Sequence, residues 1–291
     1  MFLITGFYFF RPSGISPETF STRRNSVRRL ISCFVTLVCL NTPNAEAKIF
    51  EQVSMAEALG SATLETLVIL DLDSTVIETS QMLGSDSFFQ YLLELAHARG
   101  KDRADALQWA LAENSKVQPY SPVHTVESET PALIRRLQVA GIKVIALTAR
   151  PGDWATPTLA QLKSVGVDFT PTAIGGHWGH YPEAGRFEAG VFFVDGGVQK
   201  GPALLTFLSA IGFRPVQVLF VDDKAKNVES VDQSLRSVGV PALNVRYGGA
   251  DGSIARFRPE IADCQWSVYK RYHVFISDEA AENAIEYGKC S

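Results

Sequence analysis

Short apolar runs alternate with amphipathic stretches along most of this chain. Four runs and a fifth segment have the length and composition of buried strands: LVILDL at 67–72, IKVIAL at 142–147, VFFV at 191–194, VQVLFV at 216–221, and residues 243–247. Between them, apolar residues recur at helical spacing over residues 131–140, 155–165, 202–211 and 225–238. This alternation predicts an α/β fold in which a mostly parallel sheet is flanked by helices.

Two stretches depart from the alternation. Residues 80–122 carry two further helical patterns, at 87–99 and 103–113, which we interpret as a small inserted α-helical cap. Residues 167–190 are rich in Gly, Pro and aromatic residues and predict a long irregular loop, a feature that is often functional in compact domains. We therefore expect a core from 48–79 and 123–250, a cap at 80–122, and a C-terminal extension at 251–291 that packs on the core. Selectivity is expected to come from the cap and the 167–190 loop.

The first 47 residues have the three-part pattern of a targeting segment. Arg23-Arg24 and Arg28-Arg29 precede eleven uncharged residues, LISCFVTLVCL at 30–40, and residues 45–47 (AEA) form a small-x-small site. This pattern predicts a secretory signal over residues 1–47, with cleavage after Ala47 and an exported protein, periplasmic or secreted. A second apolar patch within residues 1–22 favours a true start near Val27, with the preceding residues a gene-model extension. The apolar run is too short for a stable transmembrane span, which needs about 20 residues.

Charge and cysteine content narrow the class of protein. The net charge is −4, which argues against a nucleic-acid partner because such proteins usually carry a basic face. Cys264 and Cys290 would remain after removal of the signal. An even pair in an exported protein suggests a disulfide, although two free thiols fit the same spacing. The oligomeric state stays open.

Polar residues that suit phosphate chemistry follow four of the predicted strands. Each has an ordinary structural explanation, such as an acidic turn, a helix-capping threonine, a surface lysine or an acidic pair at a helix start. Their occurrence at successive strand ends is harder to explain in that way, because ligands bind at the carboxyl edge of open α/β sheets. In chain order these residues are Asp71 and Asp73, then Thr148, then Lys200, then Asp222 and Asp223.

This ordered set resembles the haloacid dehalogenase superfamily of aspartate-nucleophile phosphatases. DLDST at 71–75 is similar to its first motif, Thr148 in LTAR to its second, Lys200 to its third, and VDDKAKN at 221–227 to its fourth. The likeness spans roughly residues 64–250 and is closest to an exported bacterial subfamily with a small helical cap. It implies a Rossmann-like sheet and a magnesium-dependent phosphatase.

The resemblance also implies a role for each matching residue. Asp71 would attack phosphorus to form an aspartyl-phosphate, and Asp73 would serve as acid and then base. Thr148 and Lys200 would hold the phosphoryl oxygens. Mg²⁺ would be bound by the Asp71 carboxylate, the Asp73 backbone carbonyl and an acid of the fourth motif. That acid is expected to be Asp223, with Asp222 as an alternate.

Three further expectations belong to the site. Asn227 stands where the superfamily often has another Asp, and we expect it to orient a ligand or water. Arg150 is expected either to contact substrate or to pair with an acid. Because Asp73 must be protonated in the first step, we expect acidic neighbours to raise its pKa.

These inferences favour a phosphomonoester hydrolase that acts on a small molecule and uses Mg²⁺. Two alternatives stay open. One is a protein phosphatase or phosphotransferase with the same aspartate chemistry. The other is a secreted binding protein or effector built on the same fold.

Overall fold

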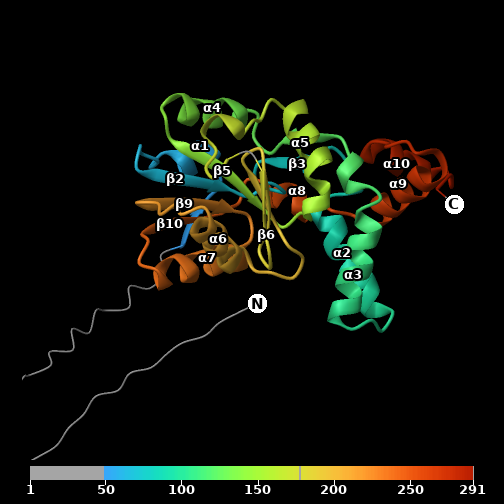
Figure 1. Ribbon diagram of the computed structural model, residues 1–291. Coiled ribbons are helices and arrows are strands. Elements are labelled where there is room, and N and C mark those ends of the chain that lie inside the picture. Colours follow the sequence, from blue (N-terminus) through green and yellow to red (C-terminus); the bar gives the residue numbers. More distant parts are fainter. Residues whose placement is uncertain (1–48, 177, 291) are drawn as a thin grey trace, which may run out of the picture. The chain divides into compact units, whose positions relative to one another are not determined.

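The computed structural model describes residues 49–176 and 178–290 (Figure 1). The predicted signal segment, its cleavage point after Ala47 and the start near Val27 lie outside the described residues. Within the described part of the chain, no helix combines the length and the apolar character needed to cross a membrane.

An eight-stranded sheet forms the centre of the fold. Its first six strands are parallel, and its last two are antiparallel. In spatial order the strands are β1 (Ile49–Gln52), β10 (Ala242–Tyr247), β9 (Gln217–Asp222), β2 (Thr66–Leu70), β5 (Lys143–Thr148), β8 (Val191–Val194), β7 (Gly185–Glu188) and β6 (Trp178–Tyr181). The predicted α/β class with a mostly parallel sheet is confirmed.

Helices cover both faces of the sheet, because the central strands are apolar on both sides. Along β2, Val68 and Leu70 belong to one apolar cluster, whereas Leu67 and Ile69 belong to the other. The first cluster includes residues of α1 (Met55–Leu59), α4 (Thr130–Val139) and α5 (Ala155–Ser164). The second includes residues of α6 (Lys200–Ala210) and α7 (Ala225–Ser237). The core therefore lies in two layers, one on each face of the sheet (Figure 1).

The prediction of an irregular loop at 167–190 is wrong for its second half. After a short 3₁₀ turn at Thr170–Thr172, the chain forms the β6–β7 hairpin, which pairs antiparallel with β8. Phe187 is fully buried and stacks on Phe207 of α6, with ring centroids 4.8 Å apart. Burial of this aromatic side chain stabilises a hairpin of four-residue strands, which are too short to show a period of two in a Gly-rich sequence.

Two antiparallel helices follow β2 where the inserted cap is expected. They are α2 (Asp86–Ala98) and α3 (Arg103–Asn114). The side chains of Ser85 and Asp102 accept hydrogen bonds from backbone N–H groups in the first turns of these helices, so both begin with an ordinary N-cap. The segments that leave and re-enter the core pair as a small antiparallel sheet of two strands, β3 (Ile77–Thr79) and β4 (Val123–Thr125). A 3₁₀ turn at Gln118–Tyr120 lies between α3 and β4.

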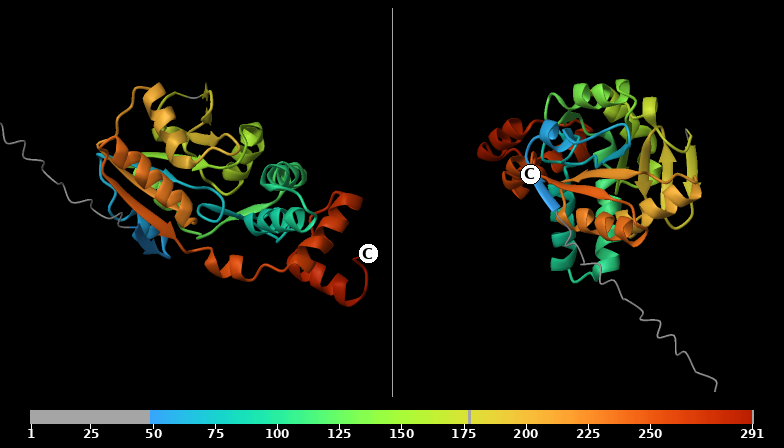
Figure 2. Two further views of the ribbon diagram at one scale, coloured as in Figure 1. Left: turned by 90° about the horizontal axis from the view of Figure 1, so that it is seen from below. Right: turned by 90° about the vertical axis from the view of Figure 1, so that its left-hand side faces the viewer.

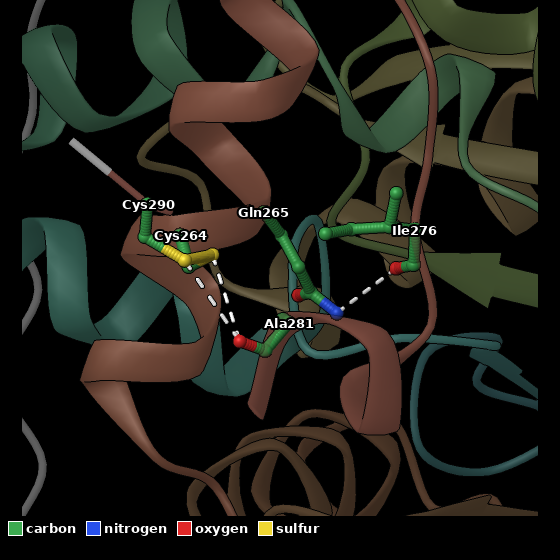
Figure 3. The surroundings of a disulfide bond; sticks show 5 residues. All are labelled: Cys264, Gln265, Ile276, Ala281 and Cys290. Atoms are coloured by element: carbon green, nitrogen blue, oxygen red, sulfur yellow. Dashed lines mark hydrogen bonds between the residues drawn. A yellow bond between two sulfur atoms is a disulfide. The ribbon is translucent and has the colours of Figure 1, made fainter. Parts of the chain in front are cut away.

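The C-terminal extension contains α8 (Asp251–Ala255), α9 (Pro259–Tyr272) and α10 (Asp278–Glu286). Cys264 and Cys290 form a disulfide, which confirms the first of the two expectations for this pair (Figure 3). Ala262 of α9 is buried in one apolar cluster with Phe88 and Leu92 of α2. The apolar clusters that contain α9 and α10 also contain residues of the inserted segment, and packing of the extension on the core stays a prediction. The left view of Figure 2 shows α2 and α3 between the sheet and these C-terminal helices.

Candidate active site

The predicted site residues meet at the carboxyl edge of four neighbouring strands. β9, β2, β5 and β8 are adjacent in the sheet, and each is followed by one of the predicted groups. Asp71 comes directly after β2, Thr148 is the last residue of β5, and Asp222 is the last residue of β9. Lys200 begins α6, the helix that follows β8. Strand order thus converts four separate sequence positions into one cluster.

Lys200 lies at the centre of this cluster. Its Nζ is 2.6 Å from Oδ1 of Asp71 and 2.7 Å from Oδ2 of Asp222, and its side chain is only 3% exposed. Burial alone would lower the pKa of Lys200, but the charges of Asp222 and Asp71 outweigh burial and raise it. Lys200 is therefore a fixed cation between two carboxylates.

One lysine does not balance the acids around it. Carboxylate oxygens of Asp71, Asp222 and Asp223 all lie within 4.8 Å of one another, and all three residues are buried. Burial, with a further contribution from the charge of Asp222, raises the pKa of Asp71 to about 7. Burial and the charge of Asp71 raise the pKa of Asp223 to about 8. The cluster has the excess negative charge that a bound cation would neutralise.

The two acids of the fourth motif have different partners. Asp222 accepts hydrogen bonds on both carboxylate oxygens, from Lys200, from the Lys224 backbone N–H and from the Asn227 amide. Oδ1 of Asp223 is buried and has no hydrogen-bond partner among the residues that the structure describes. The backbone of Asp223 is held on both sides, since its N–H donates to Thr75 and its carbonyl accepts from Arg246. Asp223 therefore presents an unused acceptor in a fixed position.

Asp73 is paired with Arg150, one of the two roles expected for that arginine. Nε and Nη2 of Arg150 donate to the two oxygens of Asp73 over 2.8 and 2.7 Å. Burial favours the neutral form of Asp73, but the charge and hydrogen bonds of Arg150 outweigh it and lower the pKa of this carboxyl. The expected upward shift is therefore wrong, because the nearest charge is a bidentate cation rather than another acid.

Arg150 is itself held by buried polar side chains. Its Nη1 donates to Thr158 at 3.1 Å and to Gln161 at 2.6 Å. Gln161 in turn donates to the backbone carbonyls of Gln118 and Ser121, both at 2.8 Å. These two residues come shortly before β4 in the chain. Arg150 thus fixes Asp73 to α5 and to the end of the inserted segment.

A cavity of about 170 Å³ opens over Asp71 and Asp73. Residues at and near the strand ends line it together with residues of the inserted segment. The residues from the inserted segment are Asp86, Phe89, Gln90, Leu111, Asn114 and Gln118. None of the described residues between 167 and 190 lines this cavity, so the expectation that this stretch contributes to selectivity is not supported.

Two side-chain amides of the inserted segment connect it to the Asp73 carboxylate. The sequence did not predict either of them. Nε2 of Gln118 donates to Oδ1 of Asp73 at 3.1 Å, and Nδ2 of Asn114 donates to Oε1 of Gln118 at 2.8 Å. Both amide residues are buried. Polar residues on a helix ordinarily face solvent, so the sequence gives no signal that this pair points inward.

Comparisons with known proteins give a family and distant relatives. A family model described as "Protein of unknown function (DUF2608)" matches residues 47–282. A "Putative outer membrane protein" of Chlamydia pneumoniae is 24% identical over 276 residues, which cover 90% of this chain and 99% of the relative. A protein of the same description from Chlamydia trachomatis serovar D is 25% identical over 214 residues, or 74% of this chain and 80% of the relative.

Solved structures with a related chain path include haloacid dehalogenase-like hydrolases. One, from Streptococcus pneumoniae, has a TM-score of 0.42 and 15% sequence identity, and the match covers 68% of this chain and 93% of that chain.

Proposed function

We propose that this chain, which belongs to the DUF2608 family, is a magnesium-dependent phosphomonoester hydrolase that acts through an aspartyl-phosphate on Asp71. The observation that carries the proposal is the position of Lys200, whose Nζ bridges Asp71 and Asp222 beside the unused acceptor of Asp223. A carboxylate repels a phosphate dianion, so a nucleophilic aspartate requires fixed cations next to it. The sheet edge supplies one such cation and ligands for a second.

The acids present fit a magnesium ion. Mg²⁺ prefers oxygen ligands and is commonly bound by one or two carboxylates together with substrate oxygens. Asp71 and Asp223 would hold the ion, with the Asp73 backbone carbonyl as the third group that the resemblance implies. Asp222 fits the role of ligand less well, because Lys200, Lys224 and Asn227 already occupy its oxygens. A bound Mg²⁺ would neutralise the negative charge of the phosphoryl oxygens and so favour attack on phosphorus.

The chain's own residues then carry two steps. An Asp71 oxygen forms a bond to phosphorus while the bond to the leaving oxygen breaks, and the Asp73 carboxyl gives its proton to that oxygen. In the second step Asp73 takes a proton from the attacking water, and the bond between Asp71 and phosphorus breaks to release phosphate. Lys200 and the hydroxyl of Thr148, which still has its proton to donate, hold the phosphoryl oxygens.

Arg150 acts on Asp73 in both steps. It keeps the carboxylate oriented, and in its ionised form Asp73 is ready to act as the base for water. Protonation for the first step is favoured when the anionic substrate arrives, since a nearby negative charge raises a carboxyl pKa.

Phosphate release from a panel of small phosphomonoesters, including an aryl phosphate, tests this function. We expect turnover by the purified protein that requires Mg²⁺ and is lost in Asp71→Asn, a change that keeps the shape of the side chain but removes the nucleophile. Folded protein that releases no phosphate from any ester, or an Asp71→Asn variant that keeps wild-type turnover, would overturn the proposal.

Export is a second part of the proposal. The disulfide between Cys264 and Cys290 is typical of oxidising compartments outside the cytoplasm. The names of the chlamydial relatives are in keeping with this location. N-terminal sequencing of the mature protein, recovered from the periplasm or medium, should begin at Lys48. An intact N-terminus on protein that remains in the cytoplasm would contradict export.

A further inference from the structure

We propose that Gln161 is a positioning residue for the second step of the reaction, in which water hydrolyses the aspartyl-phosphate. In this role Gln161 ties the orientation of the Asp73 carboxylate to the seating of the inserted segment on the core. The inference rests on the proposed hydrolase function and adds to it a residue that does not line the cavity over Asp71.

The side-chain amide of Gln161 is buried and is engaged at both ends. Gln161 lies in α5 and is 7% exposed. Its Oε1 accepts from Nη1 of Arg150 at 2.6 Å, and its Nε2 donates to the backbone carbonyls of Gln118 and Ser121, each at 2.8 Å. A guanidinium only donates and a carbonyl only accepts, so the amide cannot be turned the other way round. The direction of each bond is therefore fixed by its partners.

Through these bonds Gln161 holds both residues whose side chains donate to the Asp73 carboxylate. Arg150 donates from Nε and Nη2 to the two carboxylate oxygens, over 2.8 and 2.7 Å. Gln118 donates from Nε2 to Oδ1 over 3.1 Å. Within the described part of the chain, no other side chain donates to this carboxylate. The bonds thus close a ring that runs from Gln161 through Arg150, Asp73 and Gln118 back to Gln161.

The ring crosses from the core to the inserted segment. Gln161 and Arg150 belong to α5 and to the loop after β5, whereas Gln118 belongs to the 3₁₀ turn that follows α3. If this turn moved away from α5, Asp73 would lose the bond from Gln118, and the buried Nε2 of Gln161 would lose both acceptors. Leaving a buried donor unpaired is unfavourable. The seated position of the segment and the held orientation of Asp73 therefore favour each other.

The orientation of Asp73 matters most when it takes a proton from water. A general base must lie within hydrogen-bond reach of the proton that it removes. A displacement of about 1 Å at a reacting group can cost on the order of 100-fold in rate. In the first step, by contrast, an aryl leaving group departs as a stabilised anion and needs little help from an acid. With an aryl phosphate, loss of the held orientation should therefore slow the second step more than the first.

Another buried glutamine provides a matched control. Gln265 of α9 is 1% exposed and also contacts the backbone of the inserted segment, since its Oε1 accepts from the Leu83 N–H at 2.8 Å. Its Nε2 donates to Asp278 and to the Ile276 carbonyl. Gln265 makes no hydrogen bond to Asp73, Arg150 or Gln118. Its substitution should therefore reproduce the structural cost of losing a buried amide without an effect on Asp73.

The test measures how the protein divides between its phosphorylated and unphosphorylated forms during turnover. The full protein is mixed with saturating p-nitrophenyl phosphate and Mg²⁺, quenched in acid at steady state, and weighed by mass spectrometry. In Gln161→Met, which keeps the length of the side chain without its hydrogen bonds, we expect this ratio to rise at least about tenfold while kcat falls. In Gln265→Met the ratio should stay at the wild-type value, even if thermal melts show that both variants lose stability.

A second variant tests the link to the inserted segment. Gln161→Glu keeps an oxygen for Arg150 but replaces the donor to the carbonyls of Gln118 and Ser121 by a second oxygen. We expect the ratio to rise in this variant as well, because the contact with the inserted segment is lost. If Gln161→Met does not fold, Gln161→Glu carries the same test.

Three results would overturn the inference while the hydrolase proposal stands, because the wild type still turns over through a phosphorylated form. The first is a folded Gln161→Met variant with the wild-type ratio, and the second is a Gln161→Glu variant with that ratio. The third is an equal rise in Gln265→Met, which would show a general loosening of the inserted segment. A wild-type protein that hydrolyses no ester, or that turns over with no phosphorylated form, would instead reject the hydrolase proposal and this inference with it.

Discussion

Buried charge is the main feature of this protein at the scale of single residues. Asp71, Asp222 and Asp223 are packed together with Lys200 as the shared cation. Desolvation of a carboxylate is costly, and a neighbouring carboxylate adds to that cost. The metal-free site is therefore a source of instability at any pH where all three acids are ionised.

This charge balance predicts how stability depends on pH. The pKa values of Asp71 and Asp223 are raised to about 7 and about 8, so between pH 4 and pH 8 the folded state binds more protons than the unfolded state. Stability of the metal-free protein should then fall as pH rises through this window. We expect the Tm to drop by several degrees between pH 5 and pH 8, as measured by thermal melts in a chelator.

Magnesium should reverse this fall, since it binds the ionised acids and only the folded state holds them together. The increase in Tm on adding Mg²⁺ should be larger at pH 8 than at pH 5 and much smaller in Asp223→Asn. Asp232→Asn, which changes a buried acid outside the site, should keep the full Mg²⁺ effect. A metal-free Tm that rises from pH 5 to pH 8 would contradict the charge balance described here.

The sequence predicts which residues gather at the site, but it does not predict which groups surround each side chain. The motif spacing predicts Asp71, Thr148, Lys200 and the Asp222–Asp223 pair as one group, because each stands at or after the end of a recognisable strand. The pKa of Asp73 depends on which side chain is nearest, and Arg150 reaches it from another strand end. No local pattern in the sequence indicates that Arg150 is the side chain nearest to Asp73.

At the scale of elements, the C-terminal helices support the inserted helices. The side chain of Gln265 in α9 accepts from the Leu83 N–H at 2.8 Å and donates to Asp278. It also donates to the Ile276 carbonyl (Figure 3). Asp278 also accepts from the Met82 N–H at 2.9 Å. Residues 82–83 lead directly into α2, whose first residue, Asp86, pairs with Lys224 beside the cavity at 2.7 Å. The disulfide next to Gln265 therefore stabilises the contacts that hold residues 82–83, and with them the start of α2 beside the cavity.

Opening the disulfide should loosen this support. The bond closes a loop with a sequence separation of 26 residues, and such crosslinks typically contribute about 2–4 kcal/mol. In Cys290→Ser we expect a lower free energy of unfolding and faster hydrogen exchange of the backbone amides at 82–98. Amides of β2 and β9 act as the internal control and should exchange as slowly as in the wild type. Unchanged exchange at 82–98 would show that the inserted helices do not depend on the bond.

Strongly patterned elements were predictable, and weakly patterned ones were not. The five predicted strands are present with ends shifted by at most two residues. Four of them are mostly apolar and buried over most of their length, and β10 is apolar at four of its six positions. β6 and β7 were missed because each has only four residues and the segment around them is rich in glycine. The attachment of α9 to α2 depends on complementary surfaces of two distant segments, which periodicity does not report.

At the scale of the whole molecule, the parallel order of β9, β2, β5 and β8 makes the site. It brings groups from residue 71 to residue 223 to one edge, while the helices inserted after β2 close the cavity above them. The same arrangement separates two tasks. The strand ends hold the groups proposed to carry the chemistry, and the inserted segment holds Gln118, which donates to Asp73, and Asn114, which donates to Gln118.

The central claim is that Asp71 carries the phosphoryl group during turnover. Mass spectrometry of protein quenched in acid during reaction with a phosphomonoester and Mg²⁺ tests it most directly. We predict one added phosphoryl group on the peptide that contains Asp71, more of it in Asp73→Asn, where hydrolysis of the intermediate lacks its base, and none in Asp71→Asn. Turnover with no phosphorylated protein in Asp73→Asn, or a phosphoryl group on any other residue, would contradict the account.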